Sequence, residues 1–354
     1  MLLRMSFIVF ILVIKFIKLI RVLLDMAKKF LCLGIESTAH TFGASVVSGD
    51  GEVLSDIREM FTTEEGGLKL DEVAEHHKKV AEHVVERALK DAGVEIEDLE
   101  LISFSRAPGL APSLLVGMNA AKEIAKDGGI PLVGVNHCVA HLSSGLLFTK
   151  AKNPVFVFTS GANTQIIAFE GRKFRVFGET LDVGLGNAFD KFGRGIGLGF
   201  PCGPKIEVLA KKGSYVELPY SVKGMDLAFS GIVSHVVRLS KQKKISKQDL
   251  CYSIQENFFS MLTEVSERAL AHTGKKEIVL IGGVAANKRL CEMMGIMCKE
   301  RECMFYSVPL KYSGDNAVMI AWQGILEKKS ATKNVERWDI NPRERIDLVE
   351  VEWM

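Results

Sequence analysis

Two histidines separated by four positions are the first feature of this sequence that could do chemistry. His137 and His141 lie in the segment Asn-His-Cys-Val-Ala-His. On a helix this spacing places both imidazoles on one face, within reach of one metal ion. Histidine pairs at this spacing are more often surface or partly buried neighbours than ligands. A third ligand is therefore needed, and Asp315 is the best candidate, although its place at the start of the last expected helix also suits a simple N-cap.

Two histidines and one carboxylate would leave coordination positions open for substrate or water, as a catalytic metal requires. Zn²⁺ and Fe²⁺ both suit this donor set, so the sequence predicts one divalent metal ion without fixing its identity. The chain contains no HExxH motif, which disfavours a metalloprotease. The other histidines of the charged segment 71–92, namely His76, His77 and His83, are expected to lie mostly on its solvated face.

Three further segments combine glycine with polar side chains, a composition that lets a ligand approach the backbone. They are a turn after an apolar run, a glycine-rich stretch over 184–207 and a strand-to-helix junction over 282–287. The candidate ligand-binding residues in them are Thr159, Ser160, Gly161, Ala162, Asp190, Gly203, Glu207 and Asn287. Two carboxylates beside a ribose would accept its hydroxyl protons, and an asparagine would bond a ribose or a base. Tight turns, solvated acids and a helix start remain the alternatives for each segment taken alone.

The elements that must position these residues occur twice along the chain. Apolar runs at 30–38 and 42–48 flank a polar turn, and Gly49-Asp50-Gly51 then predicts a hairpin. The elements expected next are a helix over 71–92 ended by Gly93, a strand over 99–105, a helix over 113–126, a strand over 131–135 and a helix that carries the two histidines. The same opening order returns over 154–180. It is followed by helices over 224–240 and 248–272, a strand over 277–283, a helix from about 286, a strand over 304–309 and a last helix over 316–329.

This duplication predicts an α/β fold of two lobes that face each other across a cleft. The polar turn between the first two strands of each lobe would point into that cleft. The first of these turns, Glu36-Ser37-Thr38, carries an acid where a phosphate-binding turn would prefer none, so the two turns are expected to have different roles. No GxGxxG motif joins a strand to a helix, which disfavours a dinucleotide-binding fold.

The composition fits two lobes of a soluble globular protein. The chain has 354 residues, of which 47% are hydrophobic and 25% charged, and single cores stop growing at roughly 250–300 residues. The formal net charge of +2 gives no overall basic character, so any RNA-binding surface must be local. Seven cysteines without a CxxC pair do not form a disulfide framework, and we expect a reducing, cytoplasmic setting.

The first 25 residues differ from the rest. They are strongly apolar, yet Lys15, Lys18 and Arg21 recur every third residue, a pattern typical of a basic amphipathic helix, a poor membrane anchor or a targeting peptide. Met26 is an equally natural start. We therefore divide the chain into an extension over 1–25, a first lobe over 26–150, a second lobe over 151–329 and a tail over 330–354. Organelle targeting or membrane association of the extension stays open, and no stable membrane partner is expected.

Several longer motifs occur in a fixed order along the chain. They are LGIEST, NHCVAH, SGANTQ, GETLDVGLGNAFDKFGR, GFPCGPKIE, KGMDLAFSG, GGVAANKRL and SGDNAVMIAW. This ordered set resembles the universal tRNA threonylcarbamoyladenosine synthase family, called TsaD in bacteria and the catalytic subunit of the KEOPS complex in archaea and eukaryotes. The resemblance runs from about residue 30 to the C-terminus. NHCVAH and the closing segment 349–353 look archaeal or eukaryotic rather than bacterial.

The resemblance implies the actin/Hsp70/sugar-kinase (ASKHA) fold with a central nucleotide cleft. It also implies transfer of a threonylcarbamoyl group from threonylcarbamoyl-AMP to N6 of the adenosine immediately 3′ of the anticodon, in tRNAs that read codons beginning with A. AMP is a good leaving group, so no protein nucleophile is expected. The implied partners are tRNA, a small kinase-like ATPase subunit and a small dimerisation subunit. An ATPase or phosphotransferase of the same fold and a non-catalytic scaffold are the competing functions.

By motif, the resemblance assigns His137, His141 and Asp315 as metal ligands. It assigns residues 159–162 to the loop that binds the activated intermediate, and Asp190, Gly203, Glu207 and Asn287 to the AMP moiety. Two positions depart from the family pattern. Phe158 stands where the family usually has a tyrosine that contacts the metal or the substrate, and Ala162 stands where a second glycine is usual. Phenylalanine has no oxygen, so three protein ligands are expected instead of four.

Overall fold

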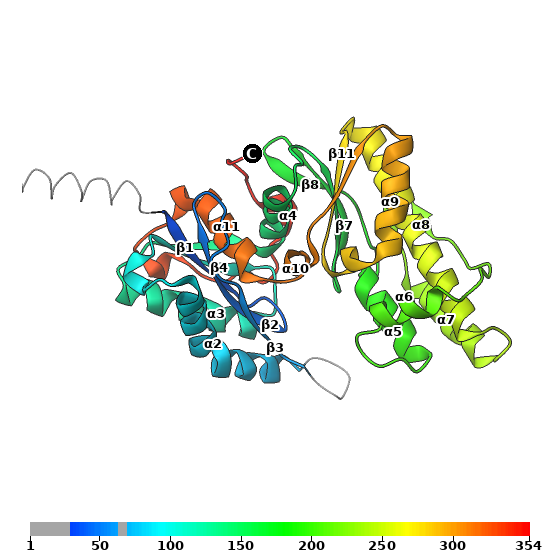
Figure 1. Cartoon of the computed structure of the whole chain (residues 1–354), viewed down its shortest axis with the longest axis horizontal. Coiled ribbons are helices and arrows are strands. Elements are labelled where there is room, and N and C mark those ends of the chain that lie inside the picture. Colours follow the sequence, from blue (N-terminus) through cyan, green and yellow to red (C-terminus); the bar gives the residue numbers. More distant parts are fainter. Residues whose placement is uncertain (1–28, 63–68) are drawn as a thin grey trace, which may run out of the picture.

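The computed structural model describes residues 29–62 and 69–354 (Figure 1). The extension over 1–25, with its targeting and membrane hypotheses, lies outside the described residues. Within the described ranges, no helix has the length and apolar character needed to cross a membrane. All seven cysteines fall in the described ranges and are free thiols, as expected for a chain without a disulfide framework.

The first lobe is built on a five-stranded sheet in the order β3-β2-β1-β4-β5. Its strands are β1 Leu31–Glu36, β2 Thr41–Ser48, β3 Ile57–Met60, β4 Leu101–Ala107 and β5 Leu132–Asn136. β1 runs antiparallel to β2 and parallel to β4. Every residue of β1 is buried, because helices cover both faces of the sheet, and the strand is accordingly apolar up to its last residue, Glu36.

Helices α2 (Leu70–Ala92) and α3 (Ala111–Asp127) cover one face of this sheet, and α11 (Ala317–Leu326) covers the other (Figure 1). α11 packs so closely on β1 that a Cβ atom at Gly34 would lie 2.4 Å from the backbone nitrogen of Ala321. The sequence division placed this helix in the segment of the second lobe, 151–329. Its apolar residues instead complete the core of the first lobe.

The second lobe repeats the topology of the first. Its sheet has the order β8-β7-β6-β11-β12 when written in the same direction. The strands are β6 Val155–Thr159, β7 Thr164–Glu170, β8 Lys173–Glu179, β11 Glu277–Ile281 and β12 Met304–Ser307. Again the first strand of the lobe runs antiparallel to the second and parallel to the fourth. The duplicated two-lobe α/β fold predicted from the sequence is confirmed.

The second sheet is also covered on both faces. One face carries the helices α5 Leu185–Gly195, α6 Gly203–Ala210, α7 Ser230–Lys241, α8 Lys247–Thr273 and α9 Lys288–Glu300. Val155 and Val157 of β6 face this layer, whereas Phe156 and Phe158 face α4 (His137–Phe148) and the C-terminal tail. The two-residue period of a strand therefore puts Phe158 on the side of the sheet where the histidines lie.

α4 lies between the two lobes (Figure 1) and contacts β4, β5 and α11 of the first lobe and β11 of the second. The tail also joins both lobes, because Thr332 pairs with Leu132 of β5 and Glu350 pairs with Lys173 of β8. Elements from three distant parts of the chain thus meet at the junction of the lobes.

Two details of the sequence prediction were wrong. The helix expected over 224–240 begins only at Ser230, because β9 (Val222–Lys223) and β10 (Asp226–Leu227) form a small hairpin around Gly224, whose φ is 66°. His77, expected on a solvated face, is fully buried, and its Nε2 donates to the carbonyl of Ala39 at 2.9 Å. Six residues further along the same helix His83 is exposed, as expected.

Candidate metal centre and ligand pocket

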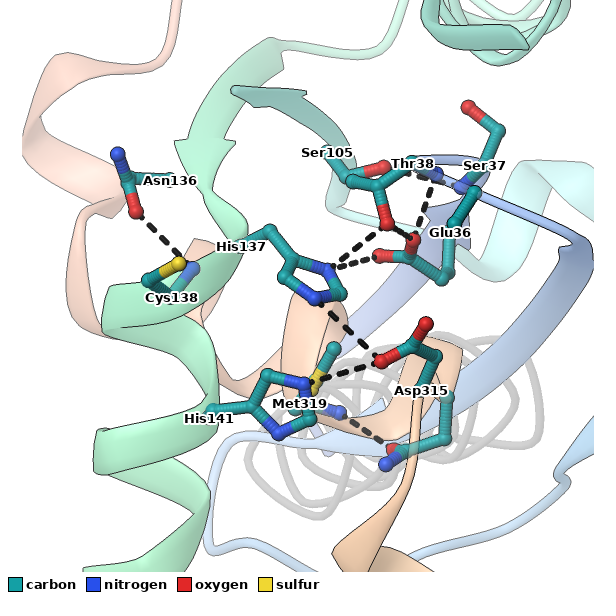
Figure 2. A network of polar contacts seen from close by, with 12 residues as sticks. Glu36, Ser37, Thr38, Ser105, Asn136, His137, Cys138, His141, Asp315 and Met319 are labelled. Carbon is teal, nitrogen blue, oxygen red and sulfur yellow. Dashed lines mark hydrogen bonds and ion pairs between the residues drawn. The ribbon is translucent and has the colours of Figure 1, made fainter. Parts of the chain in front are cut away.

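The two histidines lie on α4, which starts where β5 ends. The side chain of Asn136 accepts hydrogen bonds from the backbone N–H groups of Cys138 and Val139 and so caps this helix. His137 is the first helical residue and His141 lies one turn further, with ring centroids 4.7 Å apart. Both imidazoles point toward Asp315, which comes from the loop before α11 (Figure 2).

Asp315 Oδ1 lies 3.2 Å from His141 Nε2 and 3.5 Å from His137 Nε2. One ligand atom from each of the three side chains lies within 4.8 Å of the others. The N-cap alternative for Asp315 is excluded, because the neighbouring Asn316 side chain accepts the hydrogen bond from the Met319 N–H and caps α11. The structure therefore leaves the Asp315 carboxylate free to face the histidines.

Glu36, at the end of β1, orients the first histidine. Its Oε2 accepts a hydrogen bond from Nδ1 of His137 at 2.9 Å, and its Oε1 accepts bonds from the N–H and the hydroxyl of Thr38 (Figure 2). Glu36 is fully buried. Because its carboxylate holds the proton on Nδ1, the lone pair of His137 is presented at Nε2, on the side of Asp315. Such carboxylate–histidine pairs are the usual outer shell of metal-binding histidines.

The electrostatics of the site favour a cation. Burial opposes protonation of His137, but Glu36 and Asp315 outweigh it and hold the pKa of His137 well above its usual value. Burial also opposes ionisation of Asp315, yet the two histidines hold the pKa of this carboxyl well below its usual range. Burial lowers the pKa of His141. Two anionic carboxylates thus face two imidazoles in a small, largely buried volume.

The donor set fits a divalent metal ion. With both imidazoles neutral, Glu36 and Asp315 leave two negative charges that a divalent cation would balance. Two imidazole nitrogens and one carboxylate oxygen are a donor set used by Zn²⁺ and Fe²⁺. Nδ1 of His141 is buried without a hydrogen-bond partner among the described residues, so the polar contact that orients this ring is the one between Nε2 and Asp315.

Phe158 lies beside this centre. Its ring is fully buried and its centroid is 4.9 Å from that of His141. The structure therefore places an apolar ring at the position where the family resemblance expects a tyrosine hydroxyl. The candidate centre has three ligands from the described residues, and the ring of Phe158 forms one wall.

The polar turn after Phe158 docks on the start of α5. The carbonyls of Ser160 and Gly161 accept hydrogen bonds from the N–H groups of Gly186 and Asn187 at 3.2 and 3.0 Å. A Cβ atom at Gly184 would lie 2.4 Å from the carbonyl carbon of Ala162, so only glycine allows this approach. Thr159 is buried, whereas Gly161 and Ala162 are exposed at the tip of the turn.

The turn is also connected to the metal-site loop. Gly282, after β11, has a φ of 101° and packs on Thr159, where a Cβ atom would lie 2.3 Å from the carbonyl oxygen. Its own carbonyl accepts a hydrogen bond from the Ser313 hydroxyl at 2.8 Å. Two residues after Ser313 comes Asp315. The turn and the metal centre are thus held in a fixed relation by one chain of contacts.

The four residues expected at the AMP moiety come together in one pocket of the second lobe. Asp190, Gly203, Glu207 and Asn287 all line it, together with Gly186 and Gly283 among others. A Cβ atom at Gly203 or at Gly283 would meet nothing within 4 Å, so these glycines leave open space in the pocket.

The polar side chains of this pocket are fixed by neighbouring backbone groups. Asp190 Oδ1 accepts from the Cys202 N–H at 2.9 Å, and Glu207 Oε1 accepts from the Lys288 N–H at 3.1 Å. Asn287 both caps α9 and donates from Nδ2 to Gln255 Oε1 at 3.2 Å. Asn287 can therefore both start a helix and contact a ligand, the two roles that the sequence left open.

Sequence reasoning missed two contributors to these sites. Glu36 was recognised as an unusual acid, but its contact with His137 was not foreseen, although an acid at the end of a wholly apolar strand must find a buried partner. Gln255 was missed altogether, because a glutamine within a long helix carries no signal of its own.

Comparison with known proteins agrees with this arrangement. The family model described as tRNA N6-adenosine threonylcarbamoyltransferase (TsaD) matches residues 52–322. A protein of that name from Thermococcus sibiricus is 50% identical over 325 residues, which are 91% of this chain and 100% of that protein. A Methanosarcina mazei protein named "Probable bifunctional tRNA threonylcarbamoyladenosine biosynthesis protein" is 48% identical over 92% of this chain, which spans 60% of that longer protein.

Among solved structures, full-length HypF in a phosphate- and nucleotide-bound form superposes with a TM-score of 0.58. The alignment covers 85% of this chain and 56% of HypF at 13% identity, so it supports the two-lobe ASKHA fold alone. The family model and the 50% identical relative support family membership as well as the fold. Together with a two-histidine, one-aspartate centre beside a glycine-lined pocket, they show that this chain belongs to the tRNA N6-adenosine threonylcarbamoyltransferase (TsaD) family.

Proposed function

We propose that this chain transfers the threonylcarbamoyl group of threonylcarbamoyl-AMP to N6 of the adenosine 3′ of the anticodon, in tRNAs reading codons that begin with A. Family membership supports the transfer to a tRNA adenosine. The observation that carries the proposed site is the convergence of His137, His141 and Asp315 within 4.8 Å. Neither the phosphotransferase nor the scaffold alternative gains support from the relatives.

The reaction needs an activated carbonyl and a well-placed weak nucleophile, the exocyclic amine of adenine. A divalent ion such as Fe²⁺ or Zn²⁺, held by the three ligands, would polarise the carbonyl as a Lewis acid. Glu36 fixes the orientation of His137 and keeps its Nε2 directed into the site. The buried ring of Phe158 keeps water from one side of His141.

The second lobe would bind the two ends of the intermediate. The exposed tip of the turn at Gly161 and Ala162 suits the threonylcarbamoyl phosphate end, and the pocket with Asp190 and Glu207 suits the ribose and adenine of AMP. Holding both ends lowers the entropic cost of aligning the carbonyl with the incoming amine. AMP leaves as a stable anion, so no side chain has to act as a nucleophile.

We also propose that the chain works with KEOPS-type partners, a small kinase-like ATPase subunit and a small dimerisation subunit. The bifunctional Methanosarcina relative supports this, because its name places a second activity for the same pathway in one polypeptide. This chain spans 60% of that protein.

The proposal is tested with metal-loaded full-length protein, unmodified tRNA and threonylcarbamoyl-AMP, with and without the two partners. Mass spectrometry of the digested tRNA should show threonylcarbamoyl adenosine at the position 3′ of the anticodon. Separate loading with Fe²⁺ and Zn²⁺ identifies the productive metal. Absence of the modified nucleoside in every combination, with the metal retained, would overturn the proposal.

A further inference from the structure

A second pocket, of about 320 Å³, opens on the side of α8 and belongs to neither site described above. It is lined by Tyr215, Tyr220, Tyr252, Glu256, Asn257 and Ser260. Three of the five tyrosines of the chain gather there. Tyrosine rings around a hollow of this size are a composition typical of a binding site for a flat aromatic group.

The loop that carries Tyr215 and Tyr220 is fixed along α8. The N–H of Ser214 donates to Asp249 Oδ1 at 2.7 Å, and the N–H of Val216 donates to Ser253 Oγ at 2.7 Å. Despite this fixed backbone, Tyr215 is 55% exposed and Tyr220 is 50% exposed. The rings are thus held at the surface by an ordered loop, not packed into the core.

The floor of the pocket offers acceptors for hydrogen bonds. Asn257 is 3% exposed and its Nδ2 donates to the carbonyl of Pro219, but its Oδ1 is buried without a partner among the described residues. Glu256 is held by Arg289 through two hydrogen bonds of 2.9 and 2.7 Å, which balance its charge. A buried acceptor without a donor destabilises the free protein, and a ligand N–H group would satisfy it.

The chain segment that carries Tyr215 and Tyr220 is basic, in contrast to the chain as a whole, whereas α8 contributes acids: Glu256 lines the pocket and Glu264 accepts a hydrogen bond from the hydroxyl of Tyr220. Residues 191–247 contain eleven Lys and Arg and three Asp and Glu, whereas the complete chain has a net charge of only +2. The exposed cations nearest in sequence to the pocket are Lys211, Lys212, Lys241, Lys243, Lys244 and Lys247. The ion pairs of the described residues involve none of these six.

Close packing places part of this charge at the pocket. Gly213, which follows Lys211 and Lys212, packs against α8 so closely that a Cβ atom there would lie 2.8 Å from Cβ of Tyr252. Lys247 is the first residue of the same helix. Basic residues near the end of α7 also suit the helix dipole, which explains Lys241 without any ligand. That explanation does not extend to the tyrosines or to the unsatisfied Asn257.

We propose that the tyrosine pocket binds an unpaired base of the substrate tRNA while the neighbouring lysines contact its phosphates. This inference rests on the proposed function, which requires a bound tRNA. Stacking of splayed-out bases on aromatic side chains, with N–H groups bonded at the base edge, is the usual mode of single-stranded RNA recognition. Glu256, which lines this pocket, bonds Arg289, two residues after Asn287 of the ligand pocket.

The test measures tRNA binding by fluorescence anisotropy with metal-loaded full-length protein, at several salt concentrations. Tyr215→Ala should raise the Kd about five-fold or more, whereas Tyr215→Phe, which keeps the ring, should stay close to the wild type. Neutralising two phosphate contacts with Lys211→Ala/Lys212→Ala should reduce the slope of log K against log salt by about 1.5. Lys90→Ala/Lys126→Ala, which removes two exposed cations of the first lobe, is the matched control and should leave the slope unchanged.

Tyr215 is half exposed, so its truncation should leave the fold intact, which circular dichroism checks. Unchanged tRNA affinity of both Tyr215→Ala and the Lys211/Lys212 variant would overturn the inference. The inference would also be overturned if these variants lost affinity for a protein partner but not for tRNA. The modification assay separates this failure from that of the proposed function. If the wild type modifies tRNA and the variants bind tRNA normally, only the inference about the pocket is overturned. If the wild type never modifies tRNA, the proposed function itself is overturned.

Discussion

The carboxylate of Glu36 accepts a hydrogen bond from Nδ1 of His137 at 2.9 Å, and the two side chains are 0% and 9% exposed. This contact fixes which nitrogen of His137 faces Asp315. Glu36→Gln keeps the size of the side chain but removes its charge, and we expect metal affinity to fall about 10–100-fold. Competition with a chelator of known affinity measures the change.

A matched control for Glu36→Gln is Glu82→Gln, which alters an exposed carboxyl on α2. It should leave metal affinity at the wild-type value. Equal metal affinity of the Glu36 variant and the wild type, in protein shown to be folded, would contradict the orienting role of Glu36.

Asp315 and Asn316 are neighbours with separate roles, so mutating each of them distinguishes metal binding from helix capping. Asp315→Asn removes the anionic ligand, so we expect loss of bound metal and a fall of at least about 100-fold in tRNA modification. Asn316→Ala removes the cap of α11, so we expect it to lower the free energy of unfolding by about 0.5–2 kcal/mol while metal is retained. Metal analysis, modification rate and thermal unfolding of both variants check this. A metal-free Asn316→Ala protein, or a metal-replete and active Asp315→Asn protein, would reverse the assignment.

Because the ring of Phe158 packs against His141, we expect Phe158→Tyr to change stability differently with and without metal. In Phe158→Tyr the added hydroxyl lies in a buried setting, and without a partner it should destabilise the metal-free protein by about 1–3 kcal/mol. With metal bound, the hydroxyl can act as a further oxygen ligand, so the stabilisation by metal should exceed that of the wild type. Thermal unfolding with and without metal measures the difference.

Phe156→Tyr is the control for Phe158→Tyr, because Phe156 is equally buried on the same face of β6 but packs against Phe174. It should be destabilised to the same extent with and without metal. If Phe158→Tyr behaved in this way as well, its ring would not face the metal.

Glu327, at the end of α11, predicts a pH dependence of stability. Burial raises the pKa of this carboxyl to about 7, although Gln323 and Arg106 oppose the shift. The folded state therefore holds this proton to higher pH than the unfolded state. The associated stability is present below the unfolded pKa of about 4.5 and is lost as pH rises through about 7. Glu327→Gln removes this pH dependence. The free energy of unfolding of the variant, relative to that of the wild type, should therefore rise by about 3 kcal/mol between pH 4.5 and pH 8. Denaturant unfolding at both pH values measures this change, and a constant difference would contradict the raised pKa of the Glu327 carboxyl.

The regular elements and their duplication could be predicted because they depend on local pattern. Apolar runs of strand length and the closing glycine at Gly93 specify strands and a helix end from neighbours in sequence alone. The error at 224–229 has the same origin, since a mixed apolar and polar run next to Gly224 suits both a short hairpin and a helix. His77 was misplaced because a histidine on a charged helix is buried only when a distant element, here β2 with Phe42, covers it.

For the site, the sequence by itself determined which residue types and spacings were available. The His137–His141 spacing, the glycine-rich segments and the motif order were enough to indicate the family and to nominate the candidate ligands and pocket residues, but not the contacts made by Glu36 and Gln255. They could not decide whether Asp315 was a ligand or a cap, because both roles suit an aspartate before a helix. Only the tertiary structure excludes the cap, because Asn316 caps α11 and the Asp315 carboxylate faces the histidines of α4.

The tertiary structure also decided which lobe each part serves. α11 returns to the first sheet and α4 lies between the lobes, so residues separated by 174 positions, His141 and Asp315, come within 3.2 Å. The fully buried Glu36 joins them from β1. Contacts of this kind depend on how two covered sheets are arranged in space, and no local pattern encodes them. The sequence named the candidate ligands, and packing between the lobes brings them together.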